Sequence, residues 1–223
     1  MPDAQRKIRA IFTDIGGVLL NNGWDRHKRA EAIEKFQLDG VELNERHHLT
    51  FDTYEEGKIS LDEYLDRVIF YEPRAFTKET FKSFMYGLSE PYPEMIAMMR
   101  SIKEHHQVHI AVISNEGREL NDHRIRKFGL NTFIDSFISS SFVHIRKPDA
   151  DIFKLALDIA QMKPEEVVFI DDRPMFVQVA AGLGIKGIVH KHLEETKAAL
   201  EDLLGIRIAD IKVSSSKDNG QLI

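Results

Sequence analysis

The sequence predicts an α/β protein whose mostly parallel sheet is flanked by helices and interrupted early by a helical insertion. From Pro91 onward, short apolar runs alternate with helical segments, a pattern typical of βαβ units. One more apolar run, Ala10 to Thr13, precedes residues 22–90, which show helical periodicity and no convincing strand. Together these observations predict a Rossmann-like core with a small all-helical domain inserted after the first strand.

The elements of the core follow from hydrophobic patterning. A strand that is buried on both faces reads as a short continuous apolar run, and the run before Asp14 fits this description. After the insertion we expect strands over residues 108–113, 133–138, 167–170 and 187–189, the second being the weakest. Helices are expected over residues 92–104, 117–128, 149–161, 175–183 and 192–204.

The insertion contains three segments with helical periodicity, at residues 24–36, 61–70 and 78–86. Leu88 to Pro93 is interpreted as the return linker, because each proline disfavours helix in the residue before it. We therefore expect a core of residues 1–21 and 91–213, a helical cap of residues 22–90, and a flexible polar tail of residues 214–223.

Composition excludes several classes of function. The chain has 223 residues and a formal net charge of -6, which argues against broad nucleic-acid binding. It has no cysteine, and so no disulfide, thiolate metal site or cysteine nucleophile. No apolar run approaches the ~20 residues that span a bilayer, and the polar N-terminus lacks the apolar region of a signal peptide. We expect a cytoplasmic protein without membrane or nucleic-acid partners.

Polar side chains with catalytic potential lie where the predicted strands end. Because the carboxyl ends of parallel strands share one edge, these side chains should converge on one crevice. Two adjacent aspartates after a buried strand repel each other, and a hard divalent cation, which prefers oxygen ligands, would offset that repulsion. Alone, the serine and asparagine could cap a helix and the lysine could be solvated. The set comprises Asp14, Ser114, Asn115, Lys147, Asp171 and Asp172.

The ordered motifs closely resemble those of the haloacid dehalogenase superfamily, in its phosphatase-like branch with a helical cap. In chain order they are FTDIGGVL at residues 12–19, VISN at 112–115, KP at 147–148 and FIDD at 169–172. The resemblance extends from the first strand to about residue 190, and Glu56 to Ser60 looks like a recurrent helix-turn-helix element of such caps. Among members, the chain is similar to sugar-phosphate phosphatases that carry DxG in the first motif.

The resemblance implies a Mg²⁺-dependent phosphomonoester hydrolase that acts on a small phosphorylated metabolite, such as a sugar phosphate. Asp14 would be the nucleophile and form an aspartyl-phosphate. Magnesium would bind the side chains of Asp14 and Asp172 and the carbonyl of Gly16, and Asp171 would act through a metal-bound water. The phosphate would be contacted by Ser114, Asn115, Lys147 and Gly17, and Ser114 and Lys147 would also assist catalysis.

One departure from the family pattern is Gly16, where these phosphatases usually carry an aspartate as general acid and base. The metal site needs only the backbone carbonyl there, but proton transfer loses a group typically worth about 10²- to 10⁴-fold in rate. His27 or Asp25 could substitute, although both are expected to be surface residues. The basic run Arg26 to Arg29 could contact substrate, but a solvated helix face is the favoured interpretation.

Three alternatives stay open. A 2-haloacid dehalogenase also lacks the second aspartate of the first motif, but it needs no metal, which would leave Asp171 and Asp172 without a purpose. A phospho-accepting receiver domain carries its acidic pair at the first strand and has no helical cap, the reverse of the order found here. A non-enzymatic phosphometabolite-binding protein, catalytically weakened by Gly16, is the third.

Overall fold

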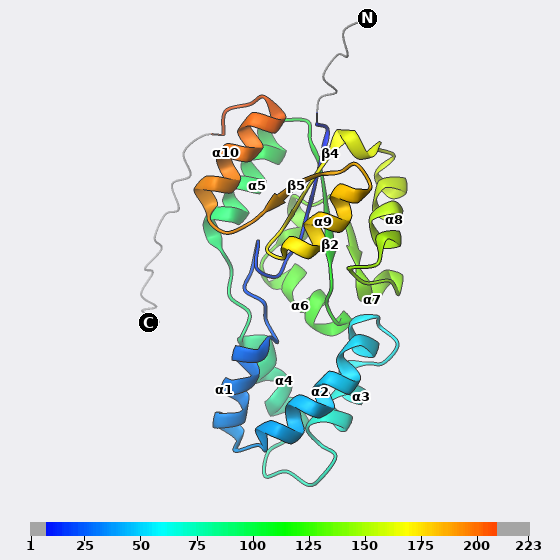
Figure 1. Ribbon diagram of the computed structural model, residues 1–223. Coiled ribbons are helices and arrows are strands. Elements are labelled where there is room, and N and C mark those ends of the chain that lie inside the picture. The colour runs from blue at the N-terminus through cyan, green and yellow to red at the C-terminus, as the bar shows by residue number, and fades with distance from the viewer. Residues whose placement is uncertain (1–7, 209–223) are drawn as a thin grey trace, which may run out of the picture.

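The computed structural model describes residues 8–208, and within them five parallel strands form one sheet in the order β3-β2-β1-β4-β5 (Figure 1). Thr13 at the end of β1 pairs with both Val112 of β2 and Ile170 of β4. The carboxyl ends of these central strands therefore lie side by side, at the point where the strand order reverses. The strands are β1 (Ala10–Thr13), β2 (His109–Ser114), β3 (Ser136–Ser139), β4 (Val167–Asp171) and β5 (Lys186–Val189).

Helices cover both faces of the sheet, because successive residues of each central strand point to opposite faces. In β1, Ile11 enters one hydrophobic cluster and Phe12 enters the other. The first cluster is closed by α5 (Pro93–His105) and α10 (Leu193–Leu204), and the second by α8 (Ala150–Ala160) and α9 (Pro174–Gly182). Figure 1 shows these two pairs on opposite sides of the strands. The predicted fold class is confirmed.

Between β1 and α5, the described chain forms four helices around a hydrophobic cluster of their own, and we call α1 to α4 the helical unit. Capping side chains define where these helices begin: Asp25 before α1, Ser60 with Glu63 in a capping box before α3, and Thr77 before α4. In Figure 1 the unit lies beyond the carboxyl edge of the sheet. Its helices are α1 (Arg26–Phe36), α2 (Gly40–Glu55), α3 (Leu61–Val68) and α4 (Lys78–Gly87).

The two connections between the core and the helical unit meet at Asn21. Its side chain donates to the carbonyl of Leu88 at 2.8 Å and accepts from the N–H of Glu90 at 3.3 Å. Its backbone N–H donates to the carbonyl of Glu90 at 2.9 Å. The outgoing and returning segments are therefore fastened to each other where they leave the sheet.

The turn between α2 and α3, residues 56–60, rests on the core at α7 (Ser140–Val143). The hydroxyl of Ser140 donates to the carbonyl of Glu55 at 2.6 Å, and His144 Nδ1 lies 2.6 Å from the carbonyl of Glu56. Gly57 has a φ of +66°, and a Cβ at this position would lie 2.3 Å from the carbonyl oxygen of Ser141. Both its conformation and this close approach require glycine.

Most predicted elements lie within a few residues of the observed ones, but α2 was not predicted. Its buried side chains are Leu43, Thr50 and Tyr54, whereas Val41 and Leu49 are 80% and 74% exposed. A helix that buries so thin an apolar stripe lacks the periodicity on which sequence prediction depends. The predicted strand at 133–138 corresponds to β3, which is displaced because residues 130–132 form a 3-10 turn. The helix predicted at 117–128 is α6 (Arg118–Lys127). The predicted tail of residues 214–223 lies outside the described residues.

Among the helices of residues 8–208, none combines the length and apolar character that crossing a membrane requires.

We predict that Gly57→Ala lowers the free energy of unfolding by about 1–3 kcal/mol, because a left-handed conformation costs an L-residue about 1–2 kcal/mol and the added Cβ meets a backbone carbonyl. Urea unfolding monitored by circular dichroism measures the change. Gly87→Ala is the matched control: it lies in α4, and its Cβ would meet nothing within 4 Å. Equal stability of the two variants would contradict the account of Gly57.

Candidate active site

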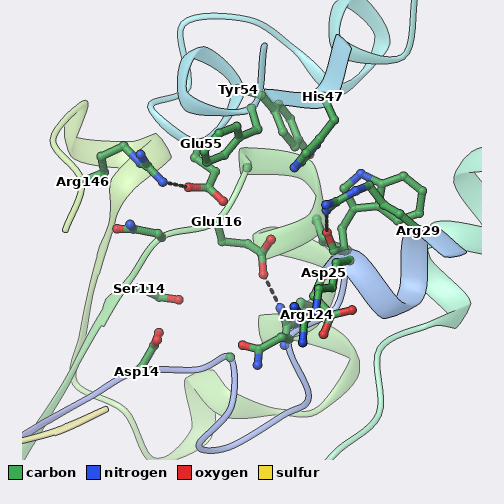
Figure 2. A pocket seen from close by; sticks show the side chains of 18 of the residues that line it. Asp14, Asp25, Arg29, His47, Tyr54, Glu55, Ser114, Glu116, Arg124 and Arg146 are labelled. Atoms are coloured by element: carbon green, nitrogen blue, oxygen red, sulfur yellow. Dashed lines mark hydrogen bonds and ion pairs between the residues drawn. The ribbon is translucent and has the colours of Figure 1, made fainter. Parts of the chain in front are cut away.

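A pocket of about 520 Å³ lies between the carboxyl edge of the sheet and the helical unit (Figure 2). Asp14 and Ser114, at the ends of β1 and β2, line its base. Tyr54 and Glu55 of α2 lie opposite, and Arg124 of α6 lies at the side. The predicted crevice is therefore a pocket, with one wall supplied by the helical unit. Its size suits a small metabolite.

Lys147 holds the centre of the charged cluster at the pocket base. Its side chain is fully buried, and its Nζ lies 3.0 Å from Asp14 Oδ2 and 2.6 Å from Asp171 Oδ2. The ring of Phe176 lies 5.1 Å from Nζ on its apolar side. A buried ammonium is tolerated only when paired, and the two carboxylates supply that pairing. The structure thus brings together three of the predicted residues.

Asp171 has both carboxylate oxygens engaged. Oδ2 accepts from Lys147, and Oδ1 accepts from the backbone N–H of Arg173 at 2.8 Å. Burial and the nearby Asp14 carboxylate raise the pKa of Asp171 to about 7, although Lys147 opposes the rise. A carboxylate with these partners is better placed to organise its neighbours than to ligate a metal directly.

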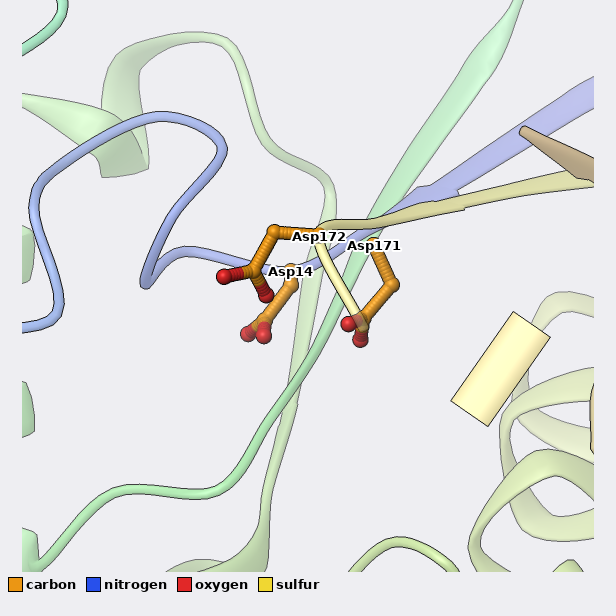
Figure 3. Close-up of side chains that lie close together, drawn as sticks. All are labelled: Asp14, Asp171 and Asp172. Atoms are coloured by element: carbon orange, nitrogen blue, oxygen red, sulfur yellow. The ribbon is translucent and has the colours of Figure 1, made fainter. Parts of the chain in front are cut away.

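Asp172 is the side chain best suited to a metal. Asp14, Asp171 and Asp172 each offer an oxygen within 4.8 Å of the others, and Figure 3 shows all three gathered at the strand ends. In the described part of the chain, Asp172 Oδ1 is buried without any hydrogen-bond partner, while Asn22 Nδ2 lies 3.4 Å from Oδ2. Because the three carboxylates are balanced by only one lysine, the cluster retains negative charge. Its ligand atoms are all oxygens, which fits a hard divalent cation such as Mg²⁺.

Gly17 leaves the room that the Asp172 carboxylate occupies. Its φ is +72°, and a Cβ there would lie 2.3 Å from Asp172 Oδ2. Its backbone N–H donates to the carbonyl of Leu20 at 2.7 Å, so this N–H is already engaged and does not point freely at a phosphate. Gly16 lines the pocket, and a Cβ at this position would lie 2.9 Å from Asn22 Oδ1.

Asn115 is tied to Lys147 rather than left free at the pocket base. Its Nδ2 donates to the carbonyl of Lys147 and its Oδ1 accepts from the N–H of Lys147, both at 2.8 Å. This two-point contact fixes the backbone from which the buried ammonium projects. Ser114, by contrast, is buried with its side chain beside Asp14 in Figure 2. Sequence reasoning missed the contact because no local signal pairs positions 32 residues apart.

Sequence reasoning also missed Glu116, whose carboxylate lies inside the pocket. It forms a close ion pair with Arg124, which is 1% exposed and whose other terminal nitrogen donates to the carbonyl of Asn21. Burial raises the pKa of Glu116 to about 7, with the charges of Glu55 and Asp14 adding to the rise and Arg124 opposing it. The available signal was its position two residues after Ser114.

The wall formed by the helical unit presents a fixed histidine. Trp24 Nε1 donates to the Tyr64 hydroxyl at 2.8 Å, and His47 Nδ1 lies 2.7 Å from the same oxygen. An indole N–H only donates, so the buried Tyr64 O–H is satisfied by donating to His47 Nδ1, which assigns the ring proton to Nε2. Burial and Arg29 lower the pKa of His47 to about 3, so this ring is neutral.

Asp25 and His27, the candidate substitutes for the missing general acid, line the pocket but make other contacts. Asp25 Oδ1 accepts from the N–H groups of His27 and Lys28 at 2.8 and 2.9 Å, as the cap of α1. His27 is exposed, and its Nε2 lies 3.2 Å from Arg26 Nε. Arg29 donates to the carbonyl of Trp24 and to Asn44, so the basic run is partly structural.

We predict that Mg²⁺ raises the thermal midpoint of the protein, because the ion binds the folded arrangement of carboxylates. A ligand at 100 times its Kd stabilises by about 2.7 kcal/mol, and Asp172→Asn should remove most of this gain. Differential scanning fluorimetry across a Mg²⁺ titration measures it. Asp202→Asn, an exposed carboxylate on α10, is the control and should respond as the unchanged protein does. A shift that survives in Asp172→Asn would contradict this site.

The chain is similar to known proteins in both sequence and fold. A family model for haloacid dehalogenase-like hydrolases matches residues 8–184. A phosphorylated carbohydrates phosphatase of Thermotoga maritima is 27% identical over 208 residues, covering 87% of this chain and 91% of that protein. Acyl-CoA dehydrogenase family member 10 of Mus musculus is 26% identical over 214 residues and 90% of this chain, but the chain spans only 19% of that longer protein.

Solved structures share the fold. A predicted haloacid dehalogenase-like hydrolase of Porphyromonas gingivalis has a TM-score of 0.71 and 24% identity, covering 88% of this chain and 98% of that one. An enzyme of the same family from Bacteroides thetaiotaomicron, in complex with magnesium and inorganic phosphate, has a TM-score of 0.69 and 23% identity, covering 82% and 94%. With a family model matching most of its length, the chain belongs to the haloacid dehalogenase-like hydrolases.

Proposed function

We propose that the protein is a Mg²⁺-dependent phosphomonoester hydrolase of small phosphorylated metabolites, sugar phosphates among them. The observation that carries the proposal is the pocket base, where one buried lysine pairs with two of three clustered carboxylates and the third, Asp172, has an unpartnered buried oxygen. This arrangement suits a cation and a dianionic phosphate bound together. It offers no comparable use for an uncharged substrate group.

Asp14 is the proposed nucleophile. Its Oδ1 accepts from the N–H of Ile15 at 2.7 Å and its Oδ2 faces Lys147, so the rotation of the carboxylate is set before substrate binds. Attack of a carboxylate oxygen on phosphorus releases the alcohol and leaves an aspartyl-phosphate, which water then hydrolyses. Lys147 counters the charge on Asp14 and on the phosphate, and the Ser114 hydroxyl is placed to donate to a phosphate oxygen.

Magnesium, when bound by Asp14, Asp172 and the carbonyl of Gly16, would neutralise charge on the phosphate. Asp171 holds Lys147 and the backbone of Arg173, which supports a positioning role next to that site. The Bacteroides thetaiotaomicron enzyme, crystallised with magnesium and inorganic phosphate, supports this choice of cofactor by analogy. The Thermotoga maritima relative, named a phosphatase of phosphorylated carbohydrates, supports the substrate class.

We also propose that the helical unit is a cap, with residues 22–90 serving a core of residues 1–21 and 91–213. Two features support this division: the unit has its own hydrophobic cluster, and its helices α1 and α2 supply one wall of the pocket. A cap over the pocket excludes water from the reacting phosphate and selects the rest of the substrate by its shape and hydrogen bonds.

The alternatives account for fewer of these features. A 2-haloacid dehalogenase shares the fold, but it leaves the unpartnered oxygen of Asp172 unexplained. A binding protein without catalysis would retain the phosphate contacts, yet it would not require the carboxylate of Asp14 to be held on both oxygens. Membership of the hydrolase family sets the receiver domain aside.

We expect the purified protein to hydrolyse p-nitrophenyl phosphate with Mg²⁺ and to lose that activity in EDTA. Asp14→Asn should lower kcat by about 10³-fold or more, because the amide is a poor nucleophile, while the fold persists. Release of p-nitrophenolate and circular dichroism are the measurements, and Asp202→Asn on α10 is the control. Equal activity in EDTA, or activity that survives Asp14→Asn, would refute the proposal. A panel of sugar phosphates then ranks substrates by kcat/KM.

A further inference from the structure

We propose that Glu116 transfers the protons in this reaction: it protonates the departing alcohol and then accepts a proton from the attacking water. The inference rests on the phosphatase function proposed above. Glu116, a loop residue of the core, would thus act as the general acid and base. Gly16 cannot do so, because it has no side chain. Three observations support it: where Glu116 lies, which of its oxygens is free, and how its surroundings affect its proton.

The direction of attack determines where a proton donor for the leaving oxygen must lie, and Glu116 lies there. Asp14 approaches phosphorus from the pocket base, and in-line displacement places the leaving oxygen on the opposite side of the phosphorus, toward the helical unit. In Figure 2, Glu116 lies between Asp14 and Ser114 on one side and Tyr54 and Glu55 on the other. A proton donor for the leaving group belongs in this space.

The loop that carries Glu116 is fixed in place. Its backbone N–H donates to the hydroxyl of Ser140 at 3.0 Å, and that hydroxyl donates to the carbonyl of Glu55. Ser114, two residues earlier, ends β2 beside Asp14. The side chain of Glu116 therefore projects from a rigid backbone that also supplies a proposed phosphate contact, which is the precision that proton transfer needs.

One carboxylate oxygen of Glu116 is held and the other faces the pocket. Oε2 pairs with Arg124, whereas within residues 8–208 no hydrogen bond engages Oε1. The Glu116 side chain is 13% exposed and that of Arg124 is 1% exposed, so the arginine is the hidden partner. Arg124 is itself anchored on the carbonyl of Asn21. The guanidinium thus fixes the carboxyl group and leaves one oxygen for substrate.

The charged groups around Glu116 favour a proton that is readily given and taken. Arg124 on α6 stabilises the ionised form, whereas burial, Glu55 on α2 and Asp14 after β1 stabilise the protonated form. The balance raises its pKa to about 7. A carboxyl group that titrates near neutrality serves both as an acid and as a base at the pH of the cell.

Other candidates at the pocket are less suitable. Asp25 caps α1 through two backbone N–H groups, and His27 is exposed beside Arg26. Glu55 is engaged by Arg146 at 2.5 Å, and it lies on α2 of the helical unit rather than on the core. Among these candidates, Glu116 is therefore the one whose loop directly follows Ser114, beside Asp14.

The two steps balance. Asp14 forms a bond to phosphorus as the bond from phosphorus to the leaving oxygen breaks, and the proton of Glu116 passes to that oxygen to give the alcohol. Glu116, now a carboxylate, takes a proton from water as the water oxygen bonds to phosphorus and the bond between phosphorus and Asp14 breaks. The products are the alcohol, inorganic phosphate and the original enzyme.

The decisive experiment assays the Glu116→Gln variant on two substrates of similar shape, p-nitrophenyl phosphate and phenyl phosphate. Stopped-flow and quenched-flow measurements in the presence of Mg²⁺ give the rate of the first step for each substrate. Phenolate needs a proton to leave, whereas p-nitrophenolate leaves readily as an anion. We expect the first step to slow by about 10²-fold or more for phenyl phosphate and by less than about tenfold for p-nitrophenyl phosphate. Because the second step also lacks its base, a burst of one p-nitrophenolate per enzyme should precede slow turnover.

Glu42→Gln is the matched control, because it also replaces a carboxyl group paired with an arginine and Glu42 does not line this pocket. It should show no such difference between the two leaving groups. Equal slowing of the first step for both substrates in Glu116→Gln would assign Glu116 a structural or binding role and overturn the inference, as would unchanged rates. An unchanged protein that hydrolyses neither substrate would instead refute the underlying phosphatase function.

A rescue variant separates proton transfer from packing. Gly16→Asp in the Glu116→Gln background returns a carboxyl group to the pocket, and the tightest contact of the added Cβ, at 2.9 Å, is with the side-chain oxygen of Asn22, which can move. We expect it to restore the first step with phenyl phosphate at least tenfold, whereas Gly16→Asn in the same background should not. Restoration by both variants, or by neither, would contradict proton transfer as the role of Glu116.

Discussion

The ammonium of Lys147 is the interaction on which the pocket base depends. It is fully buried and it separates Asp14 from Asp171, two carboxylates brought together by adjacent strands. Without a cation between them, parallel pairing of β1 and β4 would force like charges into an apolar interior. Asn115 fixes the backbone of Lys147 from the end of β2, so three strand ends and one loop form a single electrostatic unit. The same unit presents Asp172 and the pocket to a cation and a phosphate.

The positions of the strands along the chain and the residues at their ends could be predicted from the sequence, because an apolar run that ends in an acidic residue is a local pattern. Asp14 and the pair Asp171-Asp172 were found in this way, and the structure brings them together. Helix α2 could not be found, since most of its surface is polar and its burial depends on packing against α3. The cap boundaries and the roles assigned to individual residues stay predictions.

Glu116 and Arg124 show why the rest of the site was hidden. A glutamate in a loop and an arginine in a charged helix are usually solvated, and nothing nearby in the sequence marks them otherwise. Arg124 is buried against the segment at Asn21, and Glu116 pairs with it inside the pocket, contacts that join positions far apart in the chain. The neutral tautomer of His47 also depends on distant residues, because Trp24 donates to the Tyr64 hydroxyl and that hydroxyl donates to His47. Long-range packing, not local propensity, decides the chemistry of this wall.

The fastening of both connecting segments at Asn21 restricts how the pocket can admit a substrate. The chain crosses between core and helical unit twice, and hydrogen bonds at Asn21 join the two crossings into one attachment point. A second attachment lies at the turn containing Gly57, which rests on α7 and is held by hydrogen bonds of Ser140 and His144. Any rotation of the helical unit about Asn21 away from the core would break the hydrogen bonds of Ser140 and His144. Arg124 contacts both the Asn21 carbonyl and Glu116, so a single guanidinium joins the point where the two connections meet to the carboxyl group inside the pocket.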